Sequence, residues 1–360
     1  MHRPIWFLFI SFIFLISCRK DDPTPTETEM HFPSTITWES LTPTALGWDS
    51  EQLDELLTFL ESHKTRAFII LKDGKIVVEN YWGQNILQTG DFTQSSNWYW
   101  ASAGKSLSAF LVGLAQEEGL LNIEDPTSNH LGVGWSSLTT TQETAITIKH
   151  QLTMTTGLDY NVENPDCTQT ECLQYSTDPG IQWYYHNAPY TLLEGVVSSA
   201  TQMSYNDYTD RLEAKIGMNG QWIQTGDNNV YYSTPRDAAR FGLLVLNEGI
   251  WDGEAIMSDK AYFDEMINTS QNLNLSYGYL WWLNGKGSII FPGASASFAT
   301  STTPDAPDEL ISALGKNGQF IDILPGENLV IVRMGESPEN DLVPLAFHNE
   351  MWKLLIKVMK

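Results

Sequence analysis

Ser102 and Lys105 stand three positions apart in this sequence, a spacing suited to nucleophilic chemistry. At the start of a helix, residues i and i+3 share a face, so the hydroxyl and the amine can meet. A serine hydroxyl is a poor nucleophile until an adjacent base takes its proton. A lysine can be that base where burial or nearby positive charge lowers its pKa. The free N–H groups of a helix N-terminus can also stabilise a developing negative charge.

The Ser-x-x-Lys pattern alone is weak evidence, because Ser17 and Lys20 form a second copy and because serine often caps helices. The surroundings of Ser102 make the first copy more specific. Three aromatic residues, 98–100, precede it, and a strongly apolar helical stretch follows. We therefore predict that Ser102 is the nucleophile and that Lys105 is its base.

A second group of polar side chains lies at Tyr185-His186-Asn187. A tyrosine near lysine ammonium groups can have a lowered pKa and act as a general base, so Tyr185 is predicted to share proton transfer with Lys105. Asn187 can form hydrogen bonds with both Lys105 and a substrate carbonyl. His186 should face away from its neighbours and is not predicted to be catalytic. The alternative for this segment is a turn with packed aromatic rings.

The third group is Lys316-Asn317-Gly318, between two short β-like runs. Two other Lys-x-Gly patterns, at Lys72 and Lys215, fall on a hairpin turn and a helix end. The copy at Lys316 can present its amine to a substrate, while the backbone near Asn317 and Gly318 can donate an N–H to an oxyanion. A polar turn without a catalytic role is the alternative.

In this order the three groups resemble the signature of penicillin-binding proteins and β-lactamases, in which Tyr-x-Asn serves as the second motif of class C enzymes and related esterases. The resemblance spans about residues 38–360 and is greatest to the branch that contains 6-aminohexanoate-dimer hydrolase. It implies a β-lactamase/transpeptidase-like α+β fold. It also implies a serine hydrolase that acts on a small or peptide-like amide or ester through an acyl-enzyme, without metal or organic cofactor. Asn317 replaces a threonine that helps hold the carboxylate of β-lactams, so efficient β-lactam turnover is not expected.

The elements that must position these residues follow from periodicity and turn signals. Apolar residues at helical spacing predict a helix over 49–64, and Asp73-Gly74 between β-rich runs predicts a hairpin. Further helices are predicted over 103–118, 235–248 and 341–360, and strands over 309–314, 319–324 and 328–334. We expect an antiparallel sheet built from both chain ends, flanked by helices, with a mostly helical lobe at about 101–268 inserted between them.

The first residues have the pattern of an export signal. His2 and Arg3 precede an apolar run over 5–16, which is shorter than the roughly 20 residues of a membrane span. Leu15-Ile16-Ser17-Cys18 resembles a bacterial lipobox, which implies a signal peptide over 1–17, cleavage before Cys18 and a lipid on its sulfur. The Pro- and Thr-rich residues 18–37 are predicted to tether the domain over 38–360 to a membrane of the bacterial cell envelope.

Cys167 and Cys172 are close in sequence, and an exported chain permits a disulfide between them. They are too few for a zinc site, and no metal is predicted.

The net charge of −24 argues against nucleic-acid binding. Two alternatives are a Ser-His-Asp hydrolase, whose nearest motif is the imperfect Gly293–Ser297 stretch, and a catalytically inactive surface protein that binds peptidoglycan or another ligand.

Overall fold

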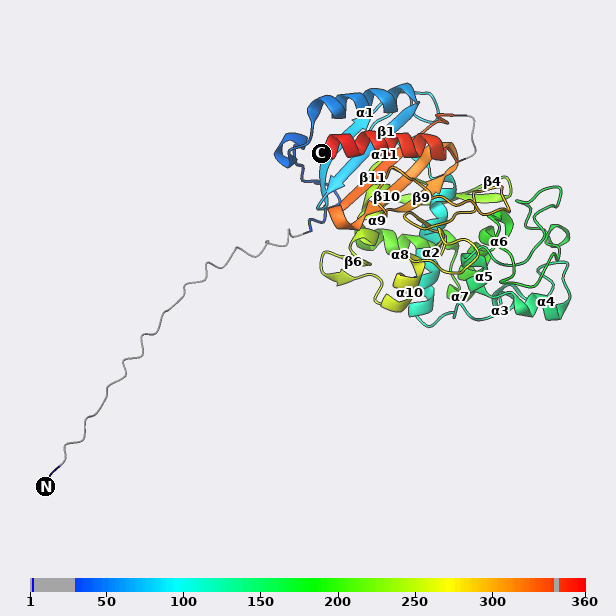
Figure 1. Cartoon of the computed structure of the whole chain (residues 1–360). Coiled ribbons are helices and arrows are strands. Elements are labelled where there is room, and N and C mark those ends of the chain that lie inside the picture. The colour runs from blue at the N-terminus through cyan, green and yellow to red at the C-terminus, as the bar shows by residue number, and fades with distance from the viewer. Residues whose placement is uncertain (1, 3–29, 340–342) are drawn as a thin grey trace. The chain divides into compact units, whose positions relative to one another are not determined.

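The structure is a computed structural model that describes residue 2 and residues 30–339 and 343–360. Residues His31–Lys360 form one compact unit (Figure 1). The signal peptide and Cys18 lie outside the described residues. The folded part begins earlier than predicted, because the backbone N–H of His31 donates to Asp73 at 3.0 Å and Arg240 donates to the carbonyl of Pro33 at 2.9 Å. No helix of the described residues is long and apolar enough to cross a membrane.

A six-stranded antiparallel sheet forms the centre of the unit, in the order β2-β1-β11-β10-β9-β8. Its strands are β1 (Thr65–Lys72), β2 (Lys75–Tyr81), β8 (Trp282–Leu283), β9 (Ile311–Gly315), β10 (Gln319–Leu324) and β11 (Leu329–Gly335). Because β1 pairs with β11, the two ends of the chain meet in the middle of the sheet. The prediction of an antiparallel sheet built from both chain ends is confirmed.

Helices cover both faces of this sheet. Strand residues alternate between faces, and Phe320 of β10 stacks against Phe347 of α11 (Leu345–Met359). On the opposite face, Ile321 and Val330 lie against Gly242 of α9 (Pro235–Leu246). Helix α1 (Ser50–Ser62) packs beside α11 (Figure 1).

A buried polar cluster fixes α11 to the sheet. Both Trp352 and His348 on α11 bond to one carboxylate oxygen of Asp322, at 2.8 and 2.7 Å. The other ring nitrogen of His348 lies 3.0 Å from the hydroxyl of Thr303. All of these side chains are buried. The bonds pair groups that are costly to leave unpaired in the core, although the other oxygen of Asp322 has no partner among the described residues.

The inserted lobe follows β2 in the chain and is mostly helical, as predicted. Its helices are α2 (Gly104–Glu117), α3 (Ser128–Leu131), α4 (Thr140–Ala145), α5 (Ile148–Leu152), α6 (Asn187–Thr191), α7 (Leu193–Thr201), α8 (Tyr205–Ile216) and α10 (Lys260–Met266). A second sheet has the order β3-β5-β4, with β3 at Trp98–Tyr99, β5 at Asn228–Ser233 and β4 at Gly220–Thr225. A two-stranded ribbon pairs β6 (Ile250–Trp251) with β7 (Glu254–Ala255).

Local chemistry accounts for the element boundaries that the sequence predicts. Asp49 caps α1 by accepting the N–H groups of Glu51 and Gln52 at 2.9 and 3.1 Å. In the turn between β1 and β2, Asp73 and Gly74 both have positive φ, 50° and 75°, as a tight hairpin turn requires.

Candidate active site

Ser102 lies where the second sheet turns into the central helix of the lobe. Strand β3 pairs with β5, and the N–H of Trp100 extends this contact by donating to Tyr231 at 2.8 Å. Ala101 then turns the chain with a φ of 48°, which is uncommon for a residue other than glycine. A short 3-10 turn, η2 (Ala101–Ala103), leads directly into α2. Ser102 is thus presented one turn before the helix, beside a cavity.

Lys105 is on the first turn of α2, and its ammonium nitrogen donates to the Ser102 hydroxyl at 3.0 Å. The side chain is buried, with Nζ above the ring of Tyr190 at 4.1 Å and 5.2 Å from the ring centre of Tyr185. Burial lowers the pKa of Lys105 to about 7, although the charge of Asp166 opposes this shift. A lysine with this pKa is partly unprotonated at neutral pH and can accept the serine proton.

Tyr185 faces the same pair of residues. The sequence predicted a lowered pKa for its phenol, and this prediction is wrong. Burial raises the pKa of this phenol, and a hydrogen bond with Ser102 opposes the shift only in part. Its ring stacks on Trp282 at 5.6 Å and meets the edge of Tyr277 at 6.2 Å. In such apolar surroundings the neutral phenol is favoured over the anion. Tyr185 can therefore pass on a proton, whereas Lys105 is the better initial base.

Asn187 begins α6 and lines the same cavity. The sequence predicted a hydrogen bond from Asn187 to Lys105, whereas the amide nitrogen donates to Asp166 at 2.7 Å. His186 is buried, and burial lowers its pKa to about 4. No histidine is among the described residues that line the cavity, so the geometry gives no support to a Ser-His-Asp arrangement.

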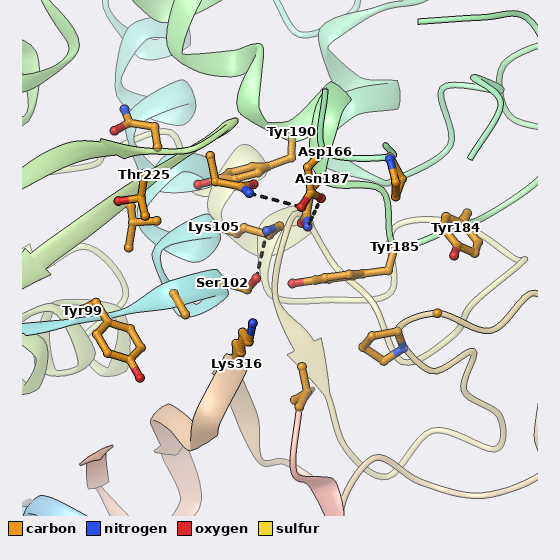
Figure 2. Close-up of a pocket in the computed structure, with 18 of the residues that line it drawn as sticks. Tyr99, Ser102, Lys105, Asp166, Tyr184, Tyr185, Asn187, Tyr190, Thr225 and Lys316 are labelled. Atoms are coloured by element: carbon orange, nitrogen blue, oxygen red, sulfur yellow. Dashed lines mark hydrogen bonds between the residues drawn. The ribbon is translucent and has the colours of Figure 1, made fainter. Parts of the chain in front are cut away.

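The third predicted group forms a turn, η4 (Lys316–Gly318), between β9 and β10. Lys316 lines the cavity across from Lys105 (Figure 2). Asn317 turns away and donates to the Tyr99 hydroxyl at 2.8 Å, and the carbonyl of Gly318 accepts from Arg333 at 2.9 Å. Neither Asn317 nor Gly318 lines the cavity, so the geometry does not support the predicted contact of these two residues with an oxyanion.

Gly315, at the end of β9, lies closer to η2 than its side-chain-bearing neighbours could, because it has no Cβ. A Cβ added at this position would come within 2.5 Å of the Trp100 carbonyl oxygen and 3.0 Å of the Ala103 nitrogen. Both are backbone atoms of the segment that holds Ser102, so they cannot move without moving the serine. The absence of a side chain at position 315 lets the strand end lie against the nucleophile turn.

Gly315→Ala is therefore expected to displace Ser102 and to reduce activity by roughly 10²-fold, the cost of a misplacement near 1 Å. The overpacking should also destabilise the fold by about 1–3 kcal/mol. Activity and denaturant unfolding would be measured on the same preparation. Gly287→Ala is the matched control, because a Cβ there meets nothing within 4 Å. Equal activity of the two variants would contradict this assignment of Gly315.

The cavity has a volume of about 560 Å³ and contains residues that the sequence did not single out. Its lining includes the predicted Ser102, Lys105, Tyr185, Asn187 and Lys316, joined by Tyr99, Asp166, Tyr184, Tyr190, Asn228 and Tyr232 (Figure 2). A signal existed for Tyr190, because i and i+3 share a helix face and Asn187 precedes it at that spacing. No comparable signal existed for Asp166, which reaches the site through a loop.

Four tryptophans near the site belong to the core rather than to the cavity wall. Trp98, Trp100, Trp281 and Trp282 are all at most 3% exposed, and none lines the cavity. Cys167 and Cys172 form a disulfide, with a Cα–Cα distance of 5.9 Å. Among residues 30–339 and 343–360, no group of three or more His, Cys, Asp or Glu side chains is placed to hold a metal ion.

The sheet, the inserted lobe and the Ser102–Lys105 pair at their junction define a protein of the β-lactamase fold class. The chain matches the family described as Beta-lactamase over residues 61–346, and it belongs to that family. The predicted family and fold class are confirmed.

Solved structures with this fold include proteins of several kinds. One is a candidate 6-aminohexanoate-dimer hydrolase from Bacillus anthracis, with 18% identity, a TM-score of 0.66 and coverage of 92% of this chain and 89% of that one. Another is a penicillin-binding protein homologue from Caulobacter crescentus, with 11% identity, a TM-score of 0.65 and coverage of 86% and 98%. At these identities the likeness shows the fold alone.

Two curated relatives are similar in sequence. An uncharacterized protein of Alkalihalophilus pseudofirmus is 24% identical over 300 residues, which cover 74% of this chain and 82% of that protein. Protein flp of Staphylococcus aureus is 25% identical over 155 residues, which cover 39% of this chain and only 31% of that protein.

Proposed function

We propose that this protein is an exported, lipid-anchored serine hydrolase that cleaves an amide or ester bond through an acyl-enzyme on Ser102. The observation that carries the proposal is the 3.0 Å contact between Lys105 and the Ser102 hydroxyl, made by a lysine whose pKa burial lowers to about 7. A nucleophile with an adjacent base of this pKa is the arrangement that acyl transfer at neutral pH requires.

In the proposed reaction, the Ser102 oxygen bonds to the substrate carbonyl carbon while its proton passes to Lys105. The backbone N–H of Ser102 would stabilise the oxyanion, and such a donor is worth about 3 to 4 kcal/mol of barrier. The C–N or C–O bond then breaks, and the leaving group takes a proton from Lys105 directly or through Tyr185. Water then bonds to the acyl carbon and loses a proton to Lys105. The bond between the acyl carbon and the Ser102 oxygen breaks, and this oxygen takes the proton back from Lys105.

The test is covalent labelling of the chain lacking residues 1 to 18 with a fluorophosphonate and, separately, with a fluorescent penicillin. Peptide mass spectrometry is expected to locate the fluorophosphonate on Ser102, and the adduct should be absent from Lys105→Ala. Labelling by neither probe would instead favour the catalytically inactive, ligand-binding alternative.

The substrate side of the proposal favours linear amides or esters over β-lactams. Asn317, at the place of the threonine that helps β-lactamases hold a substrate carboxylate, donates its amide to Tyr99 and does not line the cavity. The lining is instead rich in tyrosine and amide side chains. Labelling by penicillin as readily as by the fluorophosphonate would contradict this preference.

Export and anchoring rest on the lipobox-like residues up to Cys18, which lie outside the described residues. The protein would then be held at the bacterial cell envelope by a lipid on Cys18. Expression in a bacterium with a labelled fatty acid tests this: the label should enter the wild-type chain and not Cys18→Ser.

A further inference from the structure

Asp166 lines the same cavity as Ser102 and Lys105, in the loop directly before the disulfide. Its carboxylate accepts the amide N–H of Asn187 at 2.7 Å on one oxygen and that of Asn228 at 3.4 Å on the other (Figure 2). Asn187 belongs to α6, whereas Asn228 belongs to the β4–β5 hairpin. The carboxylate therefore joins α6 to the β4–β5 hairpin through two side-chain amides.

The loop that carries Asp166 is itself firmly placed. The backbone carbonyl of Pro165 accepts the N–H of Ala188 at 3.3 Å, and the side chain of Asn164 donates to Asp227 at 2.7 Å. The next residue, Cys167, is buried and closes the disulfide with Cys172. A cross-link beside Asp166 restricts the conformations that the loop would otherwise sample.

The orientation of Asn187 follows from this contact. With its nitrogen bonded to Asp166, the side-chain oxygen must point the other way, and it is buried without a hydrogen-bond partner among the described residues. Asn187, Asp166 and Lys105 lie together on one side of the cavity (Figure 2). Without Asp166 the amide could rotate and turn its donor toward the interior.

We propose that Asp166 is a positioning residue for the Ser102–Lys105 pair: it fixes the amide of Asn187 and places one negative charge beside Lys105. The proposal rests on the proposed function and adds to it a residue that holds Asn187 in place and whose charge opposes the effect of burial on Lys105. The other groups around Lys105 are the Ser102 hydroxyl, the neutral phenols of Tyr185 and Tyr190 and, across the cavity, Lys316. Asp166 is the only carboxylate among the described residues that line this cavity.

The expected effect of the charge has a definite sign. The charge of Asp166 raises the pKa of Lys105 above the value that burial alone would give. Asp166→Asn retains an oxygen that can accept from Asn187 but removes the charge, so Lys105 should lose its proton at lower pH. In a plot of the fluorophosphonate labelling rate of Ser102 against pH, the acid limb is where the rate falls as pH decreases. This limb is expected to shift to lower pH by on the order of one unit. The maximum labelling rate, reached on the plateau, should stay within a few-fold of wild type.

Asp166→Ala removes both the charge and the acceptor. It should show the same downward shift and, in addition, a lower plateau, because Asn187 is no longer held. Asp227→Asn is the matched control, since it also loses a carboxylate that binds an asparagine of this loop but does not line the cavity. If the wild type is labelled and the acid limb of Asp166→Asn is unchanged, the inference about Asp166 is overturned. The proposed function would still stand in that case.

A second measurement requires no catalysis and uses the full chain in detergent. The free energy of unfolding would be measured for Asp166→Asn, Lys105→Met and the double variant at pH 6 and pH 9. We expect coupling between the two sites at pH 6, where Lys105 is charged, and its loss at pH 9, where Lys105 is neutral in the folded state. No coupling at pH 6 would reject the proposal even if the wild type were never labelled.

Discussion

Ser102→Ala is expected to lower turnover by roughly 10⁴-fold or more, which is the scale of other nucleophile deletions. The base beside the serine, Lys105, is placed to take a proton from this oxygen. Turnover of an ester or amide substrate would be measured together with labelling of the residue by a fluorophosphonate. Both signals should disappear.

The fold should tolerate this change. Ser102 is only partly buried, and alanine removes one oxygen without opening a large void. The free energy of unfolding, measured by denaturant, should therefore stay within about 0.5 kcal/mol of wild type, as for substitutions outside the core. Wild-type turnover by the folded variant would exclude Ser102 as the nucleophile.

Lys105→Met is expected to reduce kcat/KM by about 10²- to 10⁴-fold, the usual contribution of a positioned base. Methionine retains much of the apolar stem of lysine and removes the amine. In the wild type, kcat/KM should rise with pH through about 7, because burial lowers the pKa of Lys105 to about 7 and only the neutral amine accepts a proton. The residual activity of Lys105→Met should not show this rise with pH.

The same substitution is expected to stabilise the fold. The pKa of Lys105 falls from 10.5 to about 7 on folding, so the unfolded chain binds more protons between these values and the free energy of unfolding rises with pH. The cost of burying the charge is fully present below pH 7 and disappears above 10.5. Lys105→Met should thus unfold at a higher denaturant concentration than wild type at pH 7, by a margin that shrinks toward pH 10. A less stable, inactive variant would point to a structural role for Lys105.

Much of the architecture could be predicted from the sequence because its signals are local. Turn residues with positive φ at 73 and 74, a capping aspartate at 49 and helical spacing after 102 each depend on a few adjacent residues. The Ser102–Lys105 contact is of the same kind, since one helical turn separates the two side chains and no distant segment is needed to bring them together.

The pKa values were decided by the tertiary structure alone. The sequence predicted a lowered pKa for Tyr185, but packing against Trp282 and Tyr277 raises it. Desolvation depends on every segment that surrounds a group, and those segments come from distant parts of the chain. The same burial is what makes Lys105 a base.

The third motif shows the same division between local and distant information. The sequence marked Lys316-Asn317-Gly318 and determined that a turn rich in polar and small residues joins two strands there. Only the docking of β9 against η2 decided that Gly315 lies beside the nucleophile turn while Gly318 faces Arg333. Asp166 reaches Asn187 across 21 positions of sequence, and no periodicity links residues so far apart. Spacing along the chain determined which groups could react, whereas contacts between distant segments decided which of them share the cavity and in which protonation state.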